Sequence, residues 1–392
     1  MTTQVVPLAS VADVVMGQSP PSSTYNNNGK GLPFFQGKAD FGELYPVARM
    51  FCTNPSRIAE AGDILISVRA PVGPTNVAEA RSCIGRGLAA LRPGNDLDSR
   101  YLLYYLRYRE PRIARMGVGS TFDAIDREDL ETIPVFIPEL REQKRIADFL
   151  QHADWLCRIR RYALELSEDF LSTEFVSLFG NPVHNPKGFR VERLEDLIDP
   201  RRPVTYGILK PGPHIADGVP YIRVVDIADG SVVAAQVRRT SHSIDKAYRR
   251  STLKAGDLLL SIRGEIGRLG IVPSDLDGAN ITQDTARLAP IADLEPAYLM
   301  GCLASRPIQR LIAQWIKGSA VKGINLGDVK ELPLPVPPRP LQTRFAELTT
   351  AHRRMRVVQR ESLRQADHLL ASLMRTAFAD DSSQVPDQHQ RN

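Results

Sequence analysis

The sequence predicts an α+β fold that is built twice, as two similar mixed globules that are each followed by a long helix. The segment AGDILISVR at residues 61–69 returns as AGDLLLSIR at residues 255–263. A Gly-Ser pair at residues 119–120 returns at residues 318–319, and the segments that follow keep a constant spacing. Loops vary in length where binding takes place, whereas a scaffold keeps its length. We therefore expect an internal pseudo-two-fold repeat.

Bulk properties limit the possible classes of protein. The length of 392 residues exceeds one ordinary core and favours two domains. Hydrophobic residues make up 43% of the chain, which is enough for real cores, yet no apolar run is long enough to span a membrane. The four cysteines lack CxxC or Cys/His spacing and no signal pattern precedes them, which is typical of reduced thiols in a cytoplasmic protein. A net charge of +5 permits a polyanionic partner without requiring one.

The first globule is expected over residues 1–137. Residues 63–69 form a short apolar run, which is typical of a buried strand. Residues 101–109 have a helical pattern, and residues 18–33 are rich in Gly, Pro and Asn, which indicates a loop. A long ordered loop in a compact domain usually serves recognition.

A long first helix is expected over residues 138–180. Pro138 is acceptable at a helix start, where its missing N–H is not needed. Apolar residues recur at steps of three and four, and Gly180-Asn181-Pro182 provides the stop. A helix of this length would measure roughly 65 Å at about 1.5 Å per residue. Such a helix must bury its apolar stripe against another element.

The second globule is expected over residues 181–336 and the second helix over residues 337–380. Residues 257–263 repeat the buried strand, residues 296–303 have a helical pattern, and residues 210–220 read as a loop. The polar segment at residues 381–392 is expected to be disordered.

Charge favours pairing of the two helices into an antiparallel coiled coil. The first helix carries a net charge of −2 and the second +4, so a mixed pair is favoured over self-association. In the alternative, each amphipathic helix packs only on its own globule. The residues predicted to pair the helices are Gln143, Ile146, Phe149, Leu150, Leu156, Gln342, Phe345, Leu348 and Met355.

Catalytic motifs are missing from the sequence. The chain has no GxxxxGK[ST] phosphate loop, no HExxH pattern and no Asn/Asp-Pro-Pro-aromatic site for a flipped base. The glycines at residues 117 and 119 lack the third glycine of a dinucleotide fingerprint. The ExK spacing at residues 142–144 is not repeated in the second half, so it indicates a helix start rather than a nuclease. We expect no cofactor and no metal in this chain.

A binding signature remains. Arg69 and Arg263 end the matching strands beside Gly-containing turns, from which they could reach phosphates or base edges. In the alternative, each arginine fixes its own loop. The segments at residues 119–121 and 318–319, with Lys322 nearby, offer backbone N–H and hydroxyl donors that suit phosphate oxygens, although plain loops would also explain them.

A second set of polar side chains follows an earlier strand in each half. Gln36, with Lys38 and Arg49 nearby, occupies the position that Arg223 occupies in the second half. Glutamine suits adenine and arginine suits guanine in direct base readout. Both positions could instead belong to the buried framework.

The chain resembles the specificity subunit of type I restriction–modification enzymes over essentially its whole length. The carrying segments are LPFFQG at residues 32–37, the two AGDxLxSxR strands, Gly-Ser leading to IPVFIP at residues 133–138, and YGILKPG at residues 206–212. The resemblance implies two target-recognition domains, residues 1–137 and 181–336, that each read one half of a bipartite DNA site and are separated by paired helices. The residues then expected to contact DNA are Gln36, Lys38, Arg49, Arg69, Ser120, Thr121, Arg223, Arg263, Ser319 and Lys322.

The resemblance also implies partners. Two methyltransferase subunits, with S-adenosylmethionine and adenine-N6 methylation, would dock on the helices, and ATP- and Mg-dependent restriction subunits would join them. The chemistry would then belong to the partners, and this chain would not be an enzyme. PPRPLQ at residues 337–342 replaces PELREQ at residues 138–143, so the two docking sites are expected to differ.

Two rival classes stay open from the residues alone. The first is a coiled-coil protein-interaction scaffold that never touches DNA, and the second is an enzyme of unrecognised type. Phosphate contact makes DNA affinity fall steeply with salt, which separates the DNA-binding class from the scaffold. If DNA is read, half-sites about one helical turn apart, roughly 34 Å or a multiple, are expected. The differing loops favour an asymmetric target.

Overall fold

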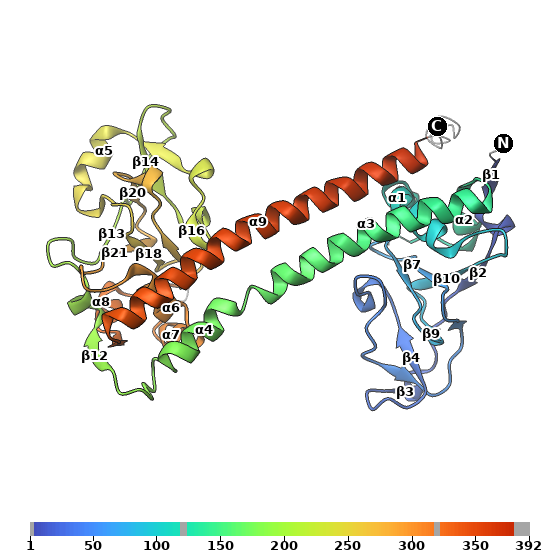
Figure 1. Cartoon of the computed structure of the whole chain (residues 1–392), viewed down its shortest axis with the longest axis horizontal. Coiled ribbons are helices and arrows are strands. Elements are labelled where there is room, and N and C mark those ends of the chain that lie inside the picture. The colour runs from blue at the N-terminus through green and yellow to red at the C-terminus, as the bar shows by residue number, and fades with distance from the viewer. Residues whose placement is uncertain (1–3, 118–123, 317–321, 380–392) are drawn as a thin grey trace. The chain divides into compact units, whose positions relative to one another are not determined.

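The structure is a computed structural model that describes residues 4–117, 124–316 and 322–379. The chain divides into two compact units. Unit 1 comprises Met1–Ala163 and Gln359–Asn392, and unit 2 comprises Leu164–Val358. Each unit therefore contains one globule together with parts of the long helices (Figure 1). The two units divide the chain within the long helices, not at residues 137, 180 and 336. The boundaries expected at those residues therefore stay predictions.

The described residues of unit 1 form three sheets. The first has the order β2-β10-β7-β8, with strands Ala12–Met16, Leu88–Pro93, Ile64–Ser67 and Thr75–Val77. The second has the order β3-β5-β4-β9-β6, with strands Tyr25–Asn26, Phe51–Cys52, Leu32–Phe35, Ser82–Ile84 and Ile58–Ala59. The third pairs β1 (Gln4–Pro7) with β11 (Pro134–Ile137). The predicted buried strand is confirmed, because all four residues of β7 are buried. The predicted loop at residues 18–33 contains short elements, including β3.

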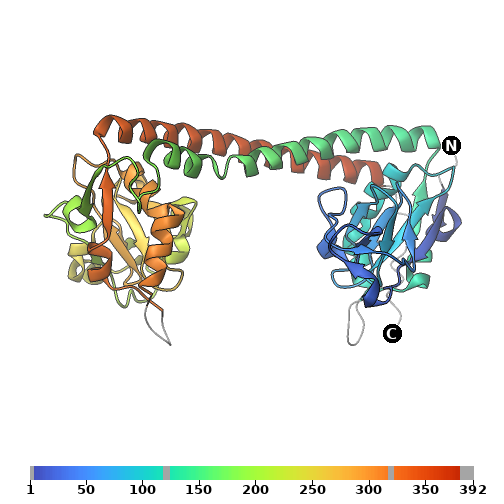
Figure 2. The same cartoon turned by 90° about the horizontal axis from the view of Figure 1, so that it is seen from below.

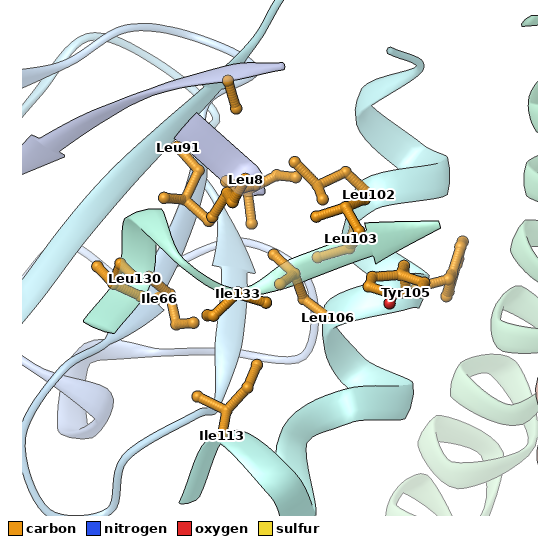
Figure 3. Packing of buried hydrophobic residues seen from close by; sticks show 14 of the residues in the cluster. Leu8, Ile66, Leu91, Leu102, Leu103, Tyr105, Leu106, Ile113, Leu130 and Ile133 are labelled. Atoms are coloured by element: carbon orange, nitrogen blue, oxygen red, sulfur yellow. The ribbon is translucent and has the colours of Figure 1, made fainter. Parts of the chain in front are cut away.

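The main core of unit 1 lies between this framework and helix α1 (Ser99–Met116). Figure 3 shows Leu102 of α1 beside Leu8, and Leu106 beside Ile133. Asp98 caps α1 by accepting hydrogen bonds from the backbone N–H groups of Arg100 and Tyr101 at 2.9 and 3.1 Å. The helical pattern predicted at residues 101–109 is confirmed, and α1 continues beyond it through Pro111. Ile113, which is 1% exposed, docks the final turns on the core. The short helix α2 spans Arg127–Glu131.

Unit 2 also combines a main sheet with two smaller ones. Its main sheet has the order β13-β21-β18-β19-β16-β15, with strands Thr205–Tyr206, Thr285–Leu288, Leu258–Ser261, Leu269–Ile271, Gly230–Val232 and Ile227–Ala228. A second sheet has the order β17-β14-β20, with strands Arg238–Thr240, Val219–Ile222 and Asn280–Ile281, and a third pairs β12 (Arg190–Arg193) with β22 (Pro333–Val336). Helices α5 (His242–Ala247), α6 (Pro296–Ala304), α7 (Arg306–Gln314) and α8 (Leu326–Lys330) also belong to this unit.

An aromatic cluster anchors the core of unit 2. Phe175 and Phe179 lie edge-on to Phe345, with ring centroids 5.5 and 5.6 Å apart. The hydroxyl of Tyr298 donates to the carbonyl oxygen of Pro335 at 2.5 Å, so its polar tip is satisfied inside the core. In unit 1 the hydroxyl of Tyr101 donates in the same way to the carbonyl oxygen of Phe136 at 2.7 Å.

The prediction of one unbroken first helix was wrong. The segment forms α3 (Leu140–Leu166) and α4 (Phe170–Phe179), whereas α9 (Arg339–Phe378) is continuous, as Figures 1 and 2 both show. At the break, the Ser167 hydroxyl donates to the carbonyl oxygen of Leu164 at 2.7 Å. The Ser167 carbonyl accepts a hydrogen bond of 2.8 Å from His352 Nε2. Side chains thus replace backbone hydrogen bonds at this point, which ends the helix.

The buried stripe of α3 differs in part from the predicted one. Residues at steps of four and three are buried: Gln143, Ala147, Leu150, Asp154 and Cys157. Leu150 and Gln143 are therefore buried, whereas Ile146 and Leu156 are half-buried and Phe149 is 60% exposed. The predicted role of these residues in pairing the helices stays a prediction. The polar Gln143 and Asp154 bond to the globule of unit 1. Gln143 Oε1 accepts the backbone N–H of Asp98 at 2.9 Å, and the hydroxyl of Tyr104 in α1 donates to Asp154 at 3.2 Å.

In α9 the buried positions also follow steps of three and four: Gln342, Phe345, Thr349 and His352. Leu348 is half-buried and Met355 is 44% exposed, so Met355 does not belong to this buried stripe of α9. In unit 2, α9 meets α4 through Phe345 and Phe175. In unit 1, Arg160 Nη1 of α3 donates to the carbonyl oxygen of Ser362 of α9 at 2.6 Å. Within each unit the long helices are therefore in direct contact.

Two further expectations bear on class. All four cysteines are free and buried. Among the residues that the structure describes, no helix is long and apolar enough to cross a membrane.

Candidate nucleic-acid interface

A cavity of about 600 Å³ in unit 1 brings together three of the predicted site residues, Gln36, Lys38 and Arg69. We call it the unit 1 groove. Its remaining lining residues are Ser19, Gly37, Ala39, Asp40, Ser67, Ala70, Pro71, Arg86 and Gly87. The side chains of Gln36, Lys38, Arg69 and Arg86 are exposed, so their polar ends are open to solvent. Three cations and one carboxylate give this groove an excess of positive charge, which suits an anionic partner.

The end of β4 positions Gln36. Asp40 Oδ2 accepts hydrogen bonds from the backbone N–H groups of Gln36 and Gly37 at 2.6 and 3.4 Å. This capping arrangement starts a short 3-10 helix, Lys38–Asp40, which carries Lys38 on the same side. Asp40 therefore fixes the loop that carries Gln36 and Lys38.

The end of β7 positions Arg69. The backbone N–H of Ile125 donates to the carbonyl oxygen of Val68 at 3.0 Å, and Arg69 forms a bridge with Ala124. The Ser67 hydroxyl donates to the carbonyl oxygen of Arg69 at 3.0 Å. The backbone of Arg69 is therefore held from both sides, and its exposed side chain leaves a rigid base.

Arg86 is a groove residue that the sequence analysis missed. It lies between Gly85 and Gly87, on the turn that enters β10. A Cβ atom on Gly87 would stand 2.2 Å from the carbonyl oxygen of Gln36, and one on Gly85 would stand 3.2 Å from the ring of Phe34. At residue 87 only glycine permits this close approach to the backbone of β4. The Gly-Arg-Gly pattern itself was the signal that could have revealed Arg86.

In unit 2, Arg263 occupies the position that Arg69 has in unit 1. The backbone N–H of Ile324 donates to the carbonyl oxygen of Ile262 at 3.0 Å, and Arg263 forms a bridge with Gly323. Arg263 Nη1 donates to Gln283 Oε1 at 3.2 Å. Lys322, which is exposed, directly precedes Gly323. The bridge thus brings Arg263 and Lys322, which are distant in the sequence, close to one another in the fold.

Arg223 serves the framework of unit 2. Its guanidinium donates to both oxygens of the buried Asp226, at 3.0 and 2.7 Å, and this hydrogen bonding raises the pKa of Arg223. Asp226 also accepts the backbone N–H of Arg223 at 2.8 Å. The guanidinium of Arg223 is therefore already paired with a carboxylate, and Arg223 belongs to the framework, which was the alternative to base readout.

The remaining predicted residues divide in two. Arg49 is exposed, but it is not among the lining residues of the unit 1 groove. Ser120, Thr121 and Ser319 lie outside the described residues.

A second basic surface in unit 2 also escaped the sequence analysis. It consists of exposed cations on β17, on α5 and on the segments beside them: Lys210, Arg238, Arg239, Lys246, Arg249 and Arg250. Thr240 at the end of β17 donates through its hydroxyl to the carbonyl oxygen of Pro211 at 2.6 Å, which joins these segments. In the described part of the chain, no acidic side chain forms an ion pair with Arg238, Lys246 or Arg249. The doubled arginines at residues 238–239 and 249–250 were its signal.

The aspartates of the repeated AGD segments are structural. Asp63 pairs with Arg92 at 2.8 Å and accepts the backbone N–H of Glu60 at 2.9 Å. Asp257 pairs with Arg202 at 2.6 Å and accepts the backbone N–H of Lys254 at 2.8 Å. Both aspartates are 3% exposed and fully partnered. Over residues 4–117, 124–316 and 322–379, no cluster of three or more His, Cys, Asp or Glu residues could hold a metal ion.

Comparisons with known proteins give matches to specificity subunits of type I restriction enzymes. Residues 2–161 match the family described as the type I restriction modification DNA specificity domain. The specificity subunit of the type I restriction enzyme MjaX from Methanocaldococcus jannaschii is 47% identical over 156 residues, which cover 40% of this chain and 37% of the relative. The EcoBI specificity subunit from Escherichia coli is 26% identical over 364 residues, which cover 85% of this chain and 75% of that protein.

A solved structure shares the fold over nearly the whole chain. The S subunit of a type I restriction–modification system from M. genitalium superposes with a TM-score of 0.64 and 16% identity, and the match covers 96% of both chains. At this level of identity the likeness establishes the mixed α/β fold alone. The matched region spans little more than a third of the MjaX subunit's own length.

Proposed function

Because the chain belongs to the specificity-subunit family of type I restriction–modification enzymes, we propose that it selects the DNA sequence on which such a complex acts. The observation that carries this proposal is the unit 1 groove. It gathers Gln36 and Arg69, which follow strands β4 and β7, with Lys38 on a short 3-10 helix and Arg86 on the turn before β10. Lysine and arginine suit phosphates, and glutamine and arginine suit base edges. The groove lies within the part of the chain that matches the DNA specificity family.

The target proposed for the chain is an asymmetric bipartite duplex. Residues 1–137 would read one half-site and residues 181–336 the other, as an internal repeat with differing loops. The recurring contacts support this proposal: Tyr101 and Tyr298 make the same buried hydrogen bond, and Arg69 and Arg263 form the same strand-end bridge. The long helices would act as an antiparallel coiled coil that sets the spacer between the half-sites.

The proposed partners are two methyltransferase subunits and two restriction subunits. The start of α3 offers a docking surface for a methyltransferase, since a groove of about 1140 Å³ lies between it and the end of α9. Phe149 lines this groove and is 60% exposed, and charged side chains such as Arg141 and Lys144 surround it. Adenine-N6 methylation, S-adenosylmethionine, ATP and Mg would belong to these partners, so this chain would be a non-catalytic subunit.

A salt series on the full chain tests the proposal. The association constant for duplex DNA is measured by fluorescence anisotropy, and log K is expected to fall linearly with log salt, with a slope of about −0.9 per phosphate contacted. Arg69→Gln is expected to weaken binding, whereas the matched change Arg375→Gln, at an exposed residue near the end of α9, is expected to leave it unchanged. An affinity that is weak at every salt concentration would favour the protein-interaction scaffold instead.

Mapping methylated adenines in the host genome tests whether the chain selects the sequence that is methylated in the cell. Cells that carry the gene are expected to methylate a split sequence that cells without it leave unmodified. Identical methylation in both strains would contradict a role in sequence selection.

A further inference from the structure

We propose that Arg86 and Gln283 occupy the same position in the two units and determine one base of each half-site. Arg86 would read guanine in one half-site, and Gln283, supported by Arg263, would read adenine in the other. This inference rests on the proposed function, because it names the residues through which sequence selection would differ between the halves.

Strand register establishes the equivalence of the two positions. In unit 1, Leu88 of β10 pairs with Ser67 of β7. In unit 2, Thr285 of β21 pairs with Ser261 of β18. Because Ser67 and Ser261 are the same residue of the repeated AGDxLxSxR segment, Leu88 and Thr285 are equivalent. Counting back two residues from each gives Arg86 and Gln283.

Backbone hydrogen bonds confirm this register on the other side of the turn. The backbone N–H of Val68 donates to the carbonyl oxygen of Gly87 at 3.0 Å, and that of Ile262 donates to the carbonyl oxygen of Asp284 at 2.8 Å. The turn itself is fixed on the neighbouring strand in both units. Gly85 N–H donates to Phe35 at 2.8 Å, and Thr282 N–H donates to Ile222 at 3.1 Å.

The turn therefore presents one side chain from a rigid base in each unit. Glycines hold the turn in unit 1, as described above. In unit 2, Gln283 N–H donates to the carbonyl oxygen of Ile208 at 3.0 Å, which ties the turn to the loop at residues 206–212. A side chain on a fixed backbone can discriminate between bases, because the loop cannot move to form hydrogen bonds with a base of the wrong shape.

The chemistry of the two residues differs in a way that matches base readout. In the described part of the chain no acidic side chain pairs with Arg86 or Arg69, so the guanidinium of Arg86 is available for the O6 and N7 acceptors of guanine. Gln283 Oε1 accepts a hydrogen bond from Arg263 Nη1 at 3.2 Å. A carboxamide oxygen has two lone pairs, so Gln283 can still accept from N6 and donate to N7 of adenine.

The preceding pair of equivalent residues strengthens the assignment. Gln36 and Arg223 also differ between the units, but Arg223 is engaged by Asp226 at 2.7 Å. In unit 2, therefore, the arginine at that position holds the framework. Arg86 and Gln283, by contrast, both lie beside the strand-end arginines, and neither is held by a carboxylate in the described part of the chain. We therefore assign the difference in base preference to this pair.

Reciprocal exchange tests the inference. The tagged full chain, purified from its own host so that native partners accompany it, selects duplexes from a randomised library. Arg86→Gln is expected to reduce the preference for guanine at one position of one half-site by about fivefold or more, with the other half-site unchanged. Gln283→Arg is expected to create a guanine preference in the other half-site.

Two controls separate base reading from other causes. Arg86→Lys keeps the charge but loses the two-pronged donor, so it is expected to keep the salt dependence of binding while losing the guanine preference. Arg375→Gln removes an exposed cation outside the groove, near the end of α9, and is expected to keep the selected sequence.

The outcomes are distinguishable. An unchanged sequence in both exchanged variants, or a uniform loss of affinity for every sequence, would overturn the assignment of base reading while leaving the proposed function intact. A wild-type chain that selects no sequence at all would overturn the proposed function itself, and the inference would fall with it.

Discussion

His352 Nε2 donates a hydrogen bond of 2.8 Å to the carbonyl oxygen of Ser167, at the point where α3 stops. The histidine is 6% exposed, and its ring stacks on Phe170 with a centroid distance of 5.4 Å. A side chain of α9 thus accommodates the break in the opposing helical segment. Without His352, the buried Ser167 carbonyl would lose this hydrogen bond.

Replacement of His352 is therefore expected to destabilise unit 2. His352→Ala should lower the free energy of unfolding by about 1–3 kcal/mol, because it leaves a buried acceptor unsatisfied and removes a packed ring. Urea denaturation of the full chain measures the change. His368→Ala, at an exposed position of α9, is the matched control and should cost less than about 0.5 kcal/mol. Equal effects of the two substitutions would contradict a specific role for His352.

Gly87 and Gly37 offer a matched pair within the unit 1 groove. Gly87→Ala should displace the turn that carries Arg86, because the added Cβ would lie 2.2 Å from the carbonyl oxygen of Gln36. An added Cβ on Gly37 meets nothing within 4 Å, so Gly37→Ala should be tolerated. We expect DNA affinity to fall about tenfold or more for the first variant only, on the premise that a misplaced Arg86 loses one good base contact. Similar affinities for both variants would show that the turn does not matter for binding.

The basic surface on β17 and α5 is expected to contact phosphates. Arg249→Gln should weaken binding to every duplex alike and reduce the salt slope by about one phosphate contact. The sequence selected from a random library should stay the same. Arg375→Gln again serves as the control. A changed base preference would mean that this surface reads sequence, and an unchanged salt slope would remove it from the interface.

Burial of Cys83 should make stability depend on alkaline pH. Burial, with Cys52 nearby, raises the pKa of the Cys83 thiol from 9.0 to about 11. The folded state therefore favours the protonated thiol, so this contribution is complete below pH 9 and is lost as the pH rises toward 11. It amounts to about 2–3 kcal/mol at two pKa units. Cys83→Ala should flatten the fall in unfolding free energy between pH 9 and 11, and an unchanged pH profile would contradict this prediction.

Spacer length is expected to follow helix length. Seven residues inserted in both long helices, after Ala163 and before Gln359, should keep the seam on the same face and lengthen each helix by about 10.5 Å. Each base pair occupies about 3.4 Å, so the preferred spacer should grow by about three base pairs with both half-sites unchanged. An equal insertion in the loop after Gly180 is the control. The same spacer in all three proteins would count against the helices as a ruler.

The sequence could predict the framework because repeated segments carry local rules. The strand at Ile64–Ser67, the continuous α9 and the paired glutamines Gln143 and Gln342 all follow from periodicity and repetition. Each of these glutamines is 1% exposed and accepts a backbone N–H at 2.9 Å, from Asp98 and Glu295 respectively. Their retention in both halves therefore has a structural cause.

The rest depended on tertiary contacts that no local pattern contains. The break after α3 requires His352, which is distant in the sequence, and the engagement of Arg223 requires Asp226 to be buried beside it. Arg86 entered the groove only because glycines on either side let its turn approach β4. In unit 1, the ends of the predicted strands were sufficient to find Gln36, Lys38 and Arg69. Arg86 was missed because it lies on a turn between two other strands.

The glycines around Arg86 have an evolutionary consequence. They hold the turn through backbone atoms alone, so the side chain between them contributes little to folding and can be exchanged at small cost to stability. A host that acquires a single substitution at this codon could therefore redirect its DNA target in one step, without rebuilding the domain that presents it.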